Sequence, residues 1–357
     1  MVINMNQSEL KQDFYKRYQP SDNYLHFTSN GILCPLLGHS EITSAPSVTC
    51  TLSMRIQMFA RALNGEQIKI QNCMSDKYLA YNFSDTASIH HNTDKDTINI
   101  IHALSAKNLR GAEILYECSI PEFLSHKEPF ELSLTQSLMK VSDIQTDISE
   151  TAALASPGKN ISEYLALAAA KSGYCTLISS GLPKNYPLPM TGYKIVSAHC
   201  AEKDIDRAKE IQYAFNAIRR MYPNVGLITE ITPQMFSAAQ ITIKNKTALK
   251  YMYHLVNENE RIERSITALK RCDIKTLFYE MIKSEKSMEK YWDIGSEHLF
   301  LARRARDADG VAAVRVWKNG IIAITEEDKV DYAISAIRNE FEENIGYKPM
   351  FCVSDAG

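Results

Sequence analysis

The chain has 357 residues, with 40 Lys and Arg against 42 Asp and Glu, and its formal net charge is −2. This balance argues against a general nucleic-acid-binding protein, which needs excess cationic side chains to displace phosphate counterions. Only 14 residues are glycine, about 4% where roughly 7% is usual, so composition alone disfavours a glycine-rich phosphate loop. The length exceeds the roughly 250–300 residues of a single core, which favours two domains.

The amino terminus has no apolar segment of the length that a signal peptide needs, and no apolar run reaches the roughly 18 residues that cross a bilayer. We therefore expect a cytoplasmic protein that binds neither membrane nor nucleic acid. His90 and His91 lie in a polar stretch and are expected in a solvated loop. The cysteines form no C-x-x-C pair and have no histidine at metal-ligand spacing, which predicts buried thiols and no metal site; they are Cys34, Cys50, Cys73, Cys118, Cys175, Cys200, Cys272 and Cys352.

In chain order, the pattern predicts an amphipathic helix over residues 8–18 and short β-like runs between residues 24 and 72. Next come three predicted helices, at 94–108, 128–142 and 159–172. Strands are predicted at 112–120, where Pro121 follows, and at 173–180 and 192–200 on either side of a Pro-containing turn.

Residues 204–304 have a mostly helical pattern, with Thr232 as an N-cap and Pro233 in a first turn. The remaining chain predicts strands at 311–317 and 321–325, a helix at 326–346 and a last strand at 349–355. An Asn-Gly pair between the first two of these strands is a strong hairpin signal. Strands and helices without regular alternation favour an α+β protein in two lobes.

Several segments together resemble galactokinases, which belong to the GHMP small-molecule kinase superfamily. The resemblance extends over residues 8–357 and includes ITPQMF, the region 255–288, IGYKPMFCVSDAG and the strand GYKIVSAHC. It implies a two-lobed GHMP kinase fold, with an N-terminal lobe over 1–187 like a ribosomal-protein domain and a ferredoxin-like C-terminal lobe over 188–357. It also implies galactose or a related sugar as substrate, and ATP with Mg²⁺ as cofactors.

The family's sugar motif, P-G-R-V-N-L-I-G-E-H-T-D, falls on residues 30–41. Ile32 takes the place of the arginine that stabilises the transferring phosphoryl group, and an aliphatic side chain cannot do this. His39 matches, Glu41 is a longer form of the family aspartate, and Gly38 replaces a glutamate. The resemblance makes Gly38, His39 and Glu41 the candidate sugar-binding residues; alternatively, His39 and Glu41 are only turn residues.

The phosphate loop of the family, N-I-P-x-G-x-G-L-S-S-S-A-S, aligns at Ile120 and Pro121. Glycines let such a loop approach phosphates closely with backbone amides pointing at the anion. Phe123 and Ser125 replace those glycines, and Lys127, Glu128 and Pro129 replace the serines. Ser125 and Lys127 are the candidate nucleotide-binding residues, with Lys127 acting as a point charge; alternatively, Lys127 is an exposed loop lysine.

Glu163 takes the position of the family's catalytic aspartate and is the candidate base. Alternatively, it is a first-turn carboxylate that complements a helix dipole. A glycine-rich turn is reduced to residues 318–320, Arg315 matches a family position, and Ile211 replaces a sugar-contacting tyrosine, with Tyr213 two residues on.

Altered catalytic elements in a retained framework predict a galactokinase-like protein with weak or no phosphoryl transfer. Its expected role is sugar binding or regulation, alone or with a protein partner. One alternative is an active sugar kinase with an unconventional ATP site, using Glu163, His39 and Glu41. Another is an inactive fold kept for protein interaction, with its cleft filled by side chains such as Phe123 and Trp317.

Overall fold

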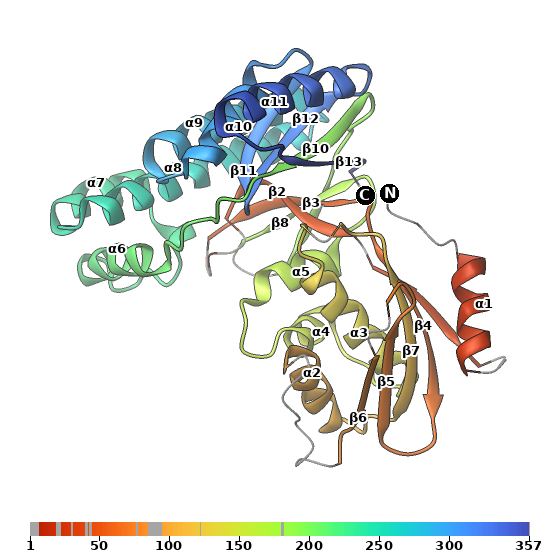
Figure 1. Cartoon of the computed structure of the whole chain (residues 1–357). Coiled ribbons are helices and arrows are strands. Elements are labelled where there is room, and N and C mark those ends of the chain that lie inside the picture. The colour runs from red at the N-terminus through yellow and green to blue at the C-terminus, as the bar shows by residue number, and fades with distance from the viewer. Residues whose placement is uncertain are drawn as a thin grey trace. The chain divides into compact units, whose positions relative to one another are not determined.

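The computed structural model describes residues 7–18, 23–29, 31–39, 42, 45–75, 78–84, 95–121, 123–179 and 182–356 (Figure 1). Glu41, His90 and His91 lie outside the described residues. Contacts divide the chain into two compact units: unit 1 comprises Met1–Ile32 and Ser53–Ala169, and unit 2 comprises Leu33–Leu52 and Ala170–Gly357. The segment Leu33–Leu52 therefore groups with the second half of the chain. The boundary between two lobes after residue 187, expected from the resemblance, stays a prediction.

Unit 1 contains a five-stranded sheet in the order β1-β4-β7-β5-β6. All its pairs are antiparallel except β5 with β7, which is parallel. The strands are β1 (Leu25–Thr28), β4 (Ile56–Leu63), β5 (Gln67–Asn72), β6 (Tyr78–Asn82) and β7 (Gly111–Cys118).

Helices cover both faces of this sheet (Figure 1). Phe59 and Leu115 are partners across β4 and β7, and both pack against α1 (Gln7–Tyr18). Neighbouring residues of a strand point to opposite faces. Accordingly, Met58 and Tyr116 contact α3 (Lys127–Val141) through Ser137 and Phe130. The other helices of unit 1 are α2 (Lys95–Ser105), α4 (Ile148–Ala155) and α5 (Ile161–Ala169).

Unit 2 contains two four-stranded sheets, in the orders β2-β3-β8-β9 and β11-β12-β10-β13. The first is built from β2 (Ile32–Gly38), β3 (Ser47–Leu52), β8 (Tyr174–Ile178) and β9 (Lys184–Pro187). The second is built from β10 (Tyr193–His199), β11 (Val311–Trp317), β12 (Gly320–Glu326) and β13 (Met350–Ser354), and all its pairs are antiparallel.

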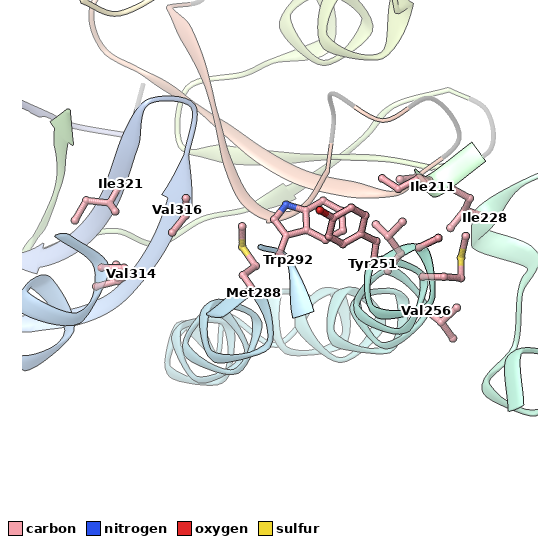
Figure 2. Packing of buried hydrophobic residues seen from close by; sticks show 14 of the residues in the cluster. Ile211, Ile228, Tyr251, Val256, Met288, Trp292, Val314, Val316 and Ile321 are labelled. Atoms are coloured by element: carbon pink, nitrogen blue, oxygen red, sulfur yellow. The ribbon is translucent and has the colours of Figure 1, made fainter. Parts of the chain in front are cut away.

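The core of unit 2 joins the second sheet to helices (Figure 2). At its centre, the rings of Tyr251 and Trp292 lie 5.3 Å apart, and Met288 packs beside Trp292. Trp292 is buried and also contacts the sugar-motif segment described below. The helices are α6 (Ala208–Met221), α7 (Pro233–Ala239), α8 (Lys246–Leu269), α9 (Ile274–Tyr291), α10 (Ser296–Asp307) and α11 (Val330–Ile345), with 3-10 turns at Ile228–Glu230, Gln240–Thr242 and Glu327–Lys329.

Most elements predicted from the sequence are confirmed, including the Thr232 cap, whose side chain accepts from the Met235 N–H. One prediction was wrong, and two elements, α4 and β6, were not predicted. The segment between β8 and β10 is not only a turn, because Lys184–Pro187 pairs with β8 as an edge strand, where a terminal proline is tolerated. Helix α4 was missed, although its N-cap Asp147 accepts from the Glu150 N–H at 2.8 Å.

The predicted hairpin of β11 and β12 is confirmed, but its glycine has a different role. Trp317 pairs with Gly320, so only Lys318 and Asn319 form the loop, and Lys318 takes the positive φ of 50°. A β-carbon on Gly320 would lie 2.0 Å from the carbonyl oxygen of Ala198 in β10. Gly320 is therefore required by the close approach of two strands rather than by the turn.

The cysteines are free thiols, as predicted, but Cys272 is exposed and only four are fully buried: Cys34, Cys50, Cys175 and Cys200. In the described part of the chain, no group of three or more His, Cys, Asp or Glu side chains is placed to hold a metal ion. None of the described helices combines the length and apolar character that crossing a membrane requires.

Candidate functional site

The candidate sugar-binding segment begins at the end of β2, where Gly38 takes a φ of +78°. A β-carbon here would lie 2.0 Å from the carbonyl oxygen of Pro46, so only glycine fits. Both polar groups of Gly38 bind buried side chains. Its N–H donates to Glu258 Oε1 at 2.9 Å, and its carbonyl oxygen accepts from Arg315 Nη2.

Glu258 is the centre of a buried polar cluster formed by Gly38, Glu258, Arg261, Ser284 and Arg315, hereafter the Glu258 cluster. The Glu258 carboxylate accepts from Arg261 Nε at 2.6 Å, from Ser284 Oγ at 2.7 Å and from Arg315 Nη1 at 3.2 Å. Burial alone would raise the pKa of Glu258, but the charges of Arg261 and Arg315 hold that pKa well below its usual range. The carboxylate is therefore ionised at neutral pH.

His39 is held beside this cluster. Its Nε2 lies 2.9 Å from His254 Nε2, and its ring centroid lies 4.1 Å from that of Trp292. His254 Nδ1 in turn lies 2.9 Å from Ser287 Oγ. Burial lowers the pKa of His254 well below its usual range, so this imidazole is neutral. Since only 2% of His39 is exposed, its ring presents almost no surface to a ligand in this arrangement.

The candidate phosphate loop leads into α3, whose first residue is Lys127. Side chains close this loop locally. Ser125 Oγ donates to Glu128 Oε2 at 3.1 Å and accepts from the Lys127 N–H at 3.4 Å. The N-cap residue, His126, makes no side-chain capping bond. The start of α3 therefore carries a carboxylate in its first turn where an anion would approach.

Lys127 also belongs to a charged network that joins α2, α3 and α5, hereafter the Asp96 network: Asp96, Lys127, Glu131, Lys159 and Tyr164. Lys127 and Lys159 both pair with Asp96, Lys159 at 3.3 Å. Lys159 Nζ also donates to Glu131 Oε1 at 2.6 Å, and the Tyr164 hydroxyl donates to the other oxygen.

Two carboxyl groups of this network titrate differently. The hydrogen bond from Lys127 lowers the pKa of Asp96, helped by Lys159. Burial raises the pKa of Glu131, against the opposing effects of Lys159 and Tyr164. Asp96 thus supplies the negative charge that keeps two lysines together.

Glu163 lies in the first turn of α5, the position expected for a carboxylate that complements the helix dipole. It directly precedes Tyr164 of the Asp96 network. Its role as a base stays a prediction. Among the other sequence candidates, Ile211 and Trp317 are buried, Trp317 lying against His199 with ring centroids 6.0 Å apart, and Tyr213 is exposed.

Unit 2 also has a hollow of about 560 Å³ beside α8. Asn259, Glu263 and Lys270 supply polar groups to its lining, and Pro46 and Leu177 supply apolar ones. Neither Gly38 nor His39 is among its lining residues. The hollow is therefore separate from the candidate sugar-binding residues that the structure describes.

Sequence reasoning singled out Gly38, His39 and Arg315 but missed Glu258, Arg261 and Ser284. A usable signal was present. Glu258 and Arg261 are three residues apart in a helix, and both fall on the face that carries buried residues such as Leu255 and Ile262. Charged residues on an apolar helix face are seldom buried without a partner.

We compared the chain with known proteins in sequence and in structure. No family model matches the chain. A galactokinase of Clostridium acetobutylicum is 29% identical over a 178-residue alignment that covers 46% of each chain, so this match spans about half of the relative's length. A galactokinase of Clostridium beijerinckii is 23% identical, and the alignment covers 96% of each chain. The crystal structure of Lactococcus lactis galactokinase complexed with galactose matches 98% of each chain with a TM-score of 0.84 and 19% identity.

The chain is similar in sequence to galactokinases, and it has the fold of galactokinase and mevalonate kinase structures. The two-lobed α+β fold implied by the resemblance is confirmed. In this galactokinase-like chain, the Glu258 cluster holds Gly38 of the segment that resembles the sugar motif. The Asp96 network includes Lys127 of the segment that resembles the phosphate loop.

Proposed function

We propose that this galactokinase-like protein binds galactose or a related sugar and transfers phosphate from ATP weakly or not at all, so that its role is in sensing or regulation. The observation that carries the proposal is the start of α3, where Lys127 is paired with Asp96 and Glu128 occupies the first turn. Similarity to galactokinases supports the sugar as ligand class.

The residues at the start of α3 fit a nucleoside triphosphate poorly. Phe123 and Ser125 stand in place of glycines, so close backbone approach to a phosphate is restricted. The Glu128 carboxylate repels an anion at this helix end. Ile32 supplies no charge to a transferring phosphoryl group, and one lost electrostatic donor of this kind costs about 3–4 kcal/mol of transition-state stabilisation.

When bound, Mg·ATP would supply the phosphoryl group and the metal that neutralises it. This chain's own contribution would be narrower. Gly38, His39 and Glu41 are the candidates for holding the sugar, and the Glu163 carboxylate is the candidate acceptor of a sugar hydroxyl proton. Ser125 and Lys127 are the candidates for phosphate contact, but each already bonds a carboxylate.

A thermal-shift experiment with the full chain tests the proposal. We expect galactose to raise the unfolding midpoint, since ligand at a hundred times its Kd adds about 2.7 kcal/mol. Mg·ATP should give no shift, and ADP release with galactose, N-acetylgalactosamine and other hexoses should stay at background. If no sugar shifts the midpoint, the sugar-binding role is wrong, and the protein-interaction alternative gains.

The active-kinase alternative has one favourable observation, the Glu163 carboxylate in the first turn of α5. Its test is Glu163→Gln. The matched control is Glu150→Gln, which changes another first-turn carboxylate, in α4. ADP release that disappears only in Glu163→Gln would establish an active kinase and refute the proposal of weak or absent transfer.

A further inference from the structure

We propose that Glu258 and Arg315 clamp the main chain of Gly38 and thereby position the sugar-recognition segment that starts there. This inference rests on the proposed sugar binding and adds two positioning residues to it. Glu258 comes from α8 and Arg315 from β11, so elements far away in the sequence fix where β2 ends. His39, a candidate sugar-binding residue, directly follows Gly38.

The two side chains bind both polar main-chain groups of Gly38. Glu258 accepts the Gly38 N–H at 2.9 Å, and Arg315 donates to the Gly38 carbonyl oxygen. Ser284 of α9 ties the two side chains together, since it donates to Glu258 at 2.7 Å and lies 2.7 Å from Arg315 Nη1. With the N–H and the carbonyl both held, the peptide planes at Gly38 have little freedom to rotate.

A count of charges shows why Arg315 matters for position. The Glu258 carboxylate is already neutralised by Arg261, whose Nε lies 2.6 Å away. Arg315 therefore adds a second buried guanidinium to a single carboxylate, at 3.2 Å. Burying a surplus charge is costly. Unlike Arg261, Arg315 also donates to the Gly38 carbonyl oxygen.

The next residue is held by the same surroundings. Arg261 Nη2 donates to the His254 carbonyl oxygen at 3.3 Å and lies 3.4 Å from Ser287 Oγ. His254 contacts the His39 ring, and Ser287 contacts the other ring nitrogen of His254. The main chain of Gly38 and the side chain of His39 are thus fixed by one connected set of bonds.

Arg315→Met is the informative variant, because it leaves the balanced pair of Glu258 and Arg261 in place. The matched control is Arg264→Met, which removes an arginine that joins α8 to Glu280 of α9 and has no bond to β2. Hydrogen exchange of the full chain, followed by mass spectrometry, reports on the peptide that ends β2. Its rate is compared with that of a peptide from β10, so that a change in overall stability is recognised.

We expect Arg315→Met to speed exchange at Gly38 and His39 relative to β10, and to weaken galactose binding by calorimetry about tenfold, the loss of one charge-assisted bond. Arg315→Lys should recover part of both effects. Arg264→Met should behave as the unmodified protein. If Arg315→Met does not fold, Ser284→Ala, which loses no charge, should give a smaller change in the same direction.

Unchanged exchange at Gly38 in Arg315→Met would overturn the clamp. Faster exchange with unchanged galactose affinity would overturn its positioning role. If the unmodified protein binds no hexose, the proposed function fails, and exchange alone decides the clamp: faster exchange confined to Arg315→Met supports it, and equal rates in both variants refute it.

Discussion

The Asp96 network and the Glu258 cluster are both charged, but they differ in exposure. The Lys127 and Asp96 side chains are 52% and 26% exposed, whereas those of Arg315 and Glu258 are 2% and 1% exposed. Ion pairs in contact with water are weak and screened by salt. Buried charges depend on their partners, because water cannot replace them. Stability should therefore depend strongly on the charged groups around Gly38 and much less on those around Lys127.

Glycine shows the same contrast. At Gly38 and Gly320 a β-carbon would lie 2.0 Å from a backbone oxygen, so glycine is obligatory. At the start of α3, Phe123 and Ser125 stand where the galactokinase phosphate-loop motif has glycines, and side-chain bonds such as Ser125 with Glu128 close the loop. Glycine is thus present at two positions where the fold of unit 2 requires it, and it is absent from Phe123 and Ser125 at the start of α3.

The sharpest test of this contrast is Glu258→Ala, which leaves Arg261 and Arg315 buried without their carboxylate. We expect a loss of about 3–5 kcal/mol in the free energy of unfolding, measured in urea. The control is Glu280→Ala, since Glu280 is paired mainly with Arg264, whose side chain is 48% exposed. Water can solvate that arginine, so the loss should be clearly smaller. Equal losses in the two variants would contradict the special role given to the Glu258 cluster.

Acid should destabilise unit 2 through its buried histidines. Burial lowers the pKa of His199 from 6.5 to about 4, with Lys318 and His298 acting in the same direction. The folded state keeps this ring neutral while the unfolded chain takes up a proton, so stability is present above pH 6.5 and falls as the pH drops toward about 4. The loss is roughly 3 kcal/mol.

Urea unfolding between about pH 7.5 and pH 4.5 measures this slope, and His199→Gln should flatten it. The control is His102→Gln, which changes a partly exposed histidine of unit 1. In unit 1 the pKa of Asp96 is lowered from 3.8, so its stabilisation persists until the pH falls below that value. A slope that His199→Gln does not change would refute the assignment to this ring.

Much of this architecture could be predicted from the sequence, because it rests on periodicity and end signals. The Thr232-Pro233 start of α7 and the hairpin after Trp317 follow from local chemistry. The Glu258 cluster could not be predicted in full, because Gly38, Glu258 and Arg315 meet only through tertiary packing. The pairing of Lys127 with Asp96 was missed for the same reason: α2 must first pack beside α3.

A smaller effect should follow from Tyr164→Phe in the Asp96 network. Tyr164 is buried, and its hydroxyl donates to the Glu131 carboxylate. Removing this donor leaves one oxygen of a buried carboxylate unpaired, which costs about 2 kcal/mol. The control is Tyr18→Phe, where the hydroxyl bond to Gln71 is long, at 3.4 Å. Urea unfolding should separate the two variants, and equal costs would mean that the Tyr164 bond adds nothing.

The smallest effect should come from Asp96→Asn, and it tests the exposed side of the comparison. Lys159 keeps Glu131 as a partner, and the largely exposed Lys127 ammonium can be solvated by water. We expect a loss below about 1 kcal/mol, shrinking as salt rises from about 0.05 M to about 0.5 M. Urea unfolding at both salt concentrations measures it. A loss above about 2 kcal/mol that salt does not reduce would mean that Asp96 behaves as a buried charge, as Glu258 does. The difference drawn between the two regions would then be wrong.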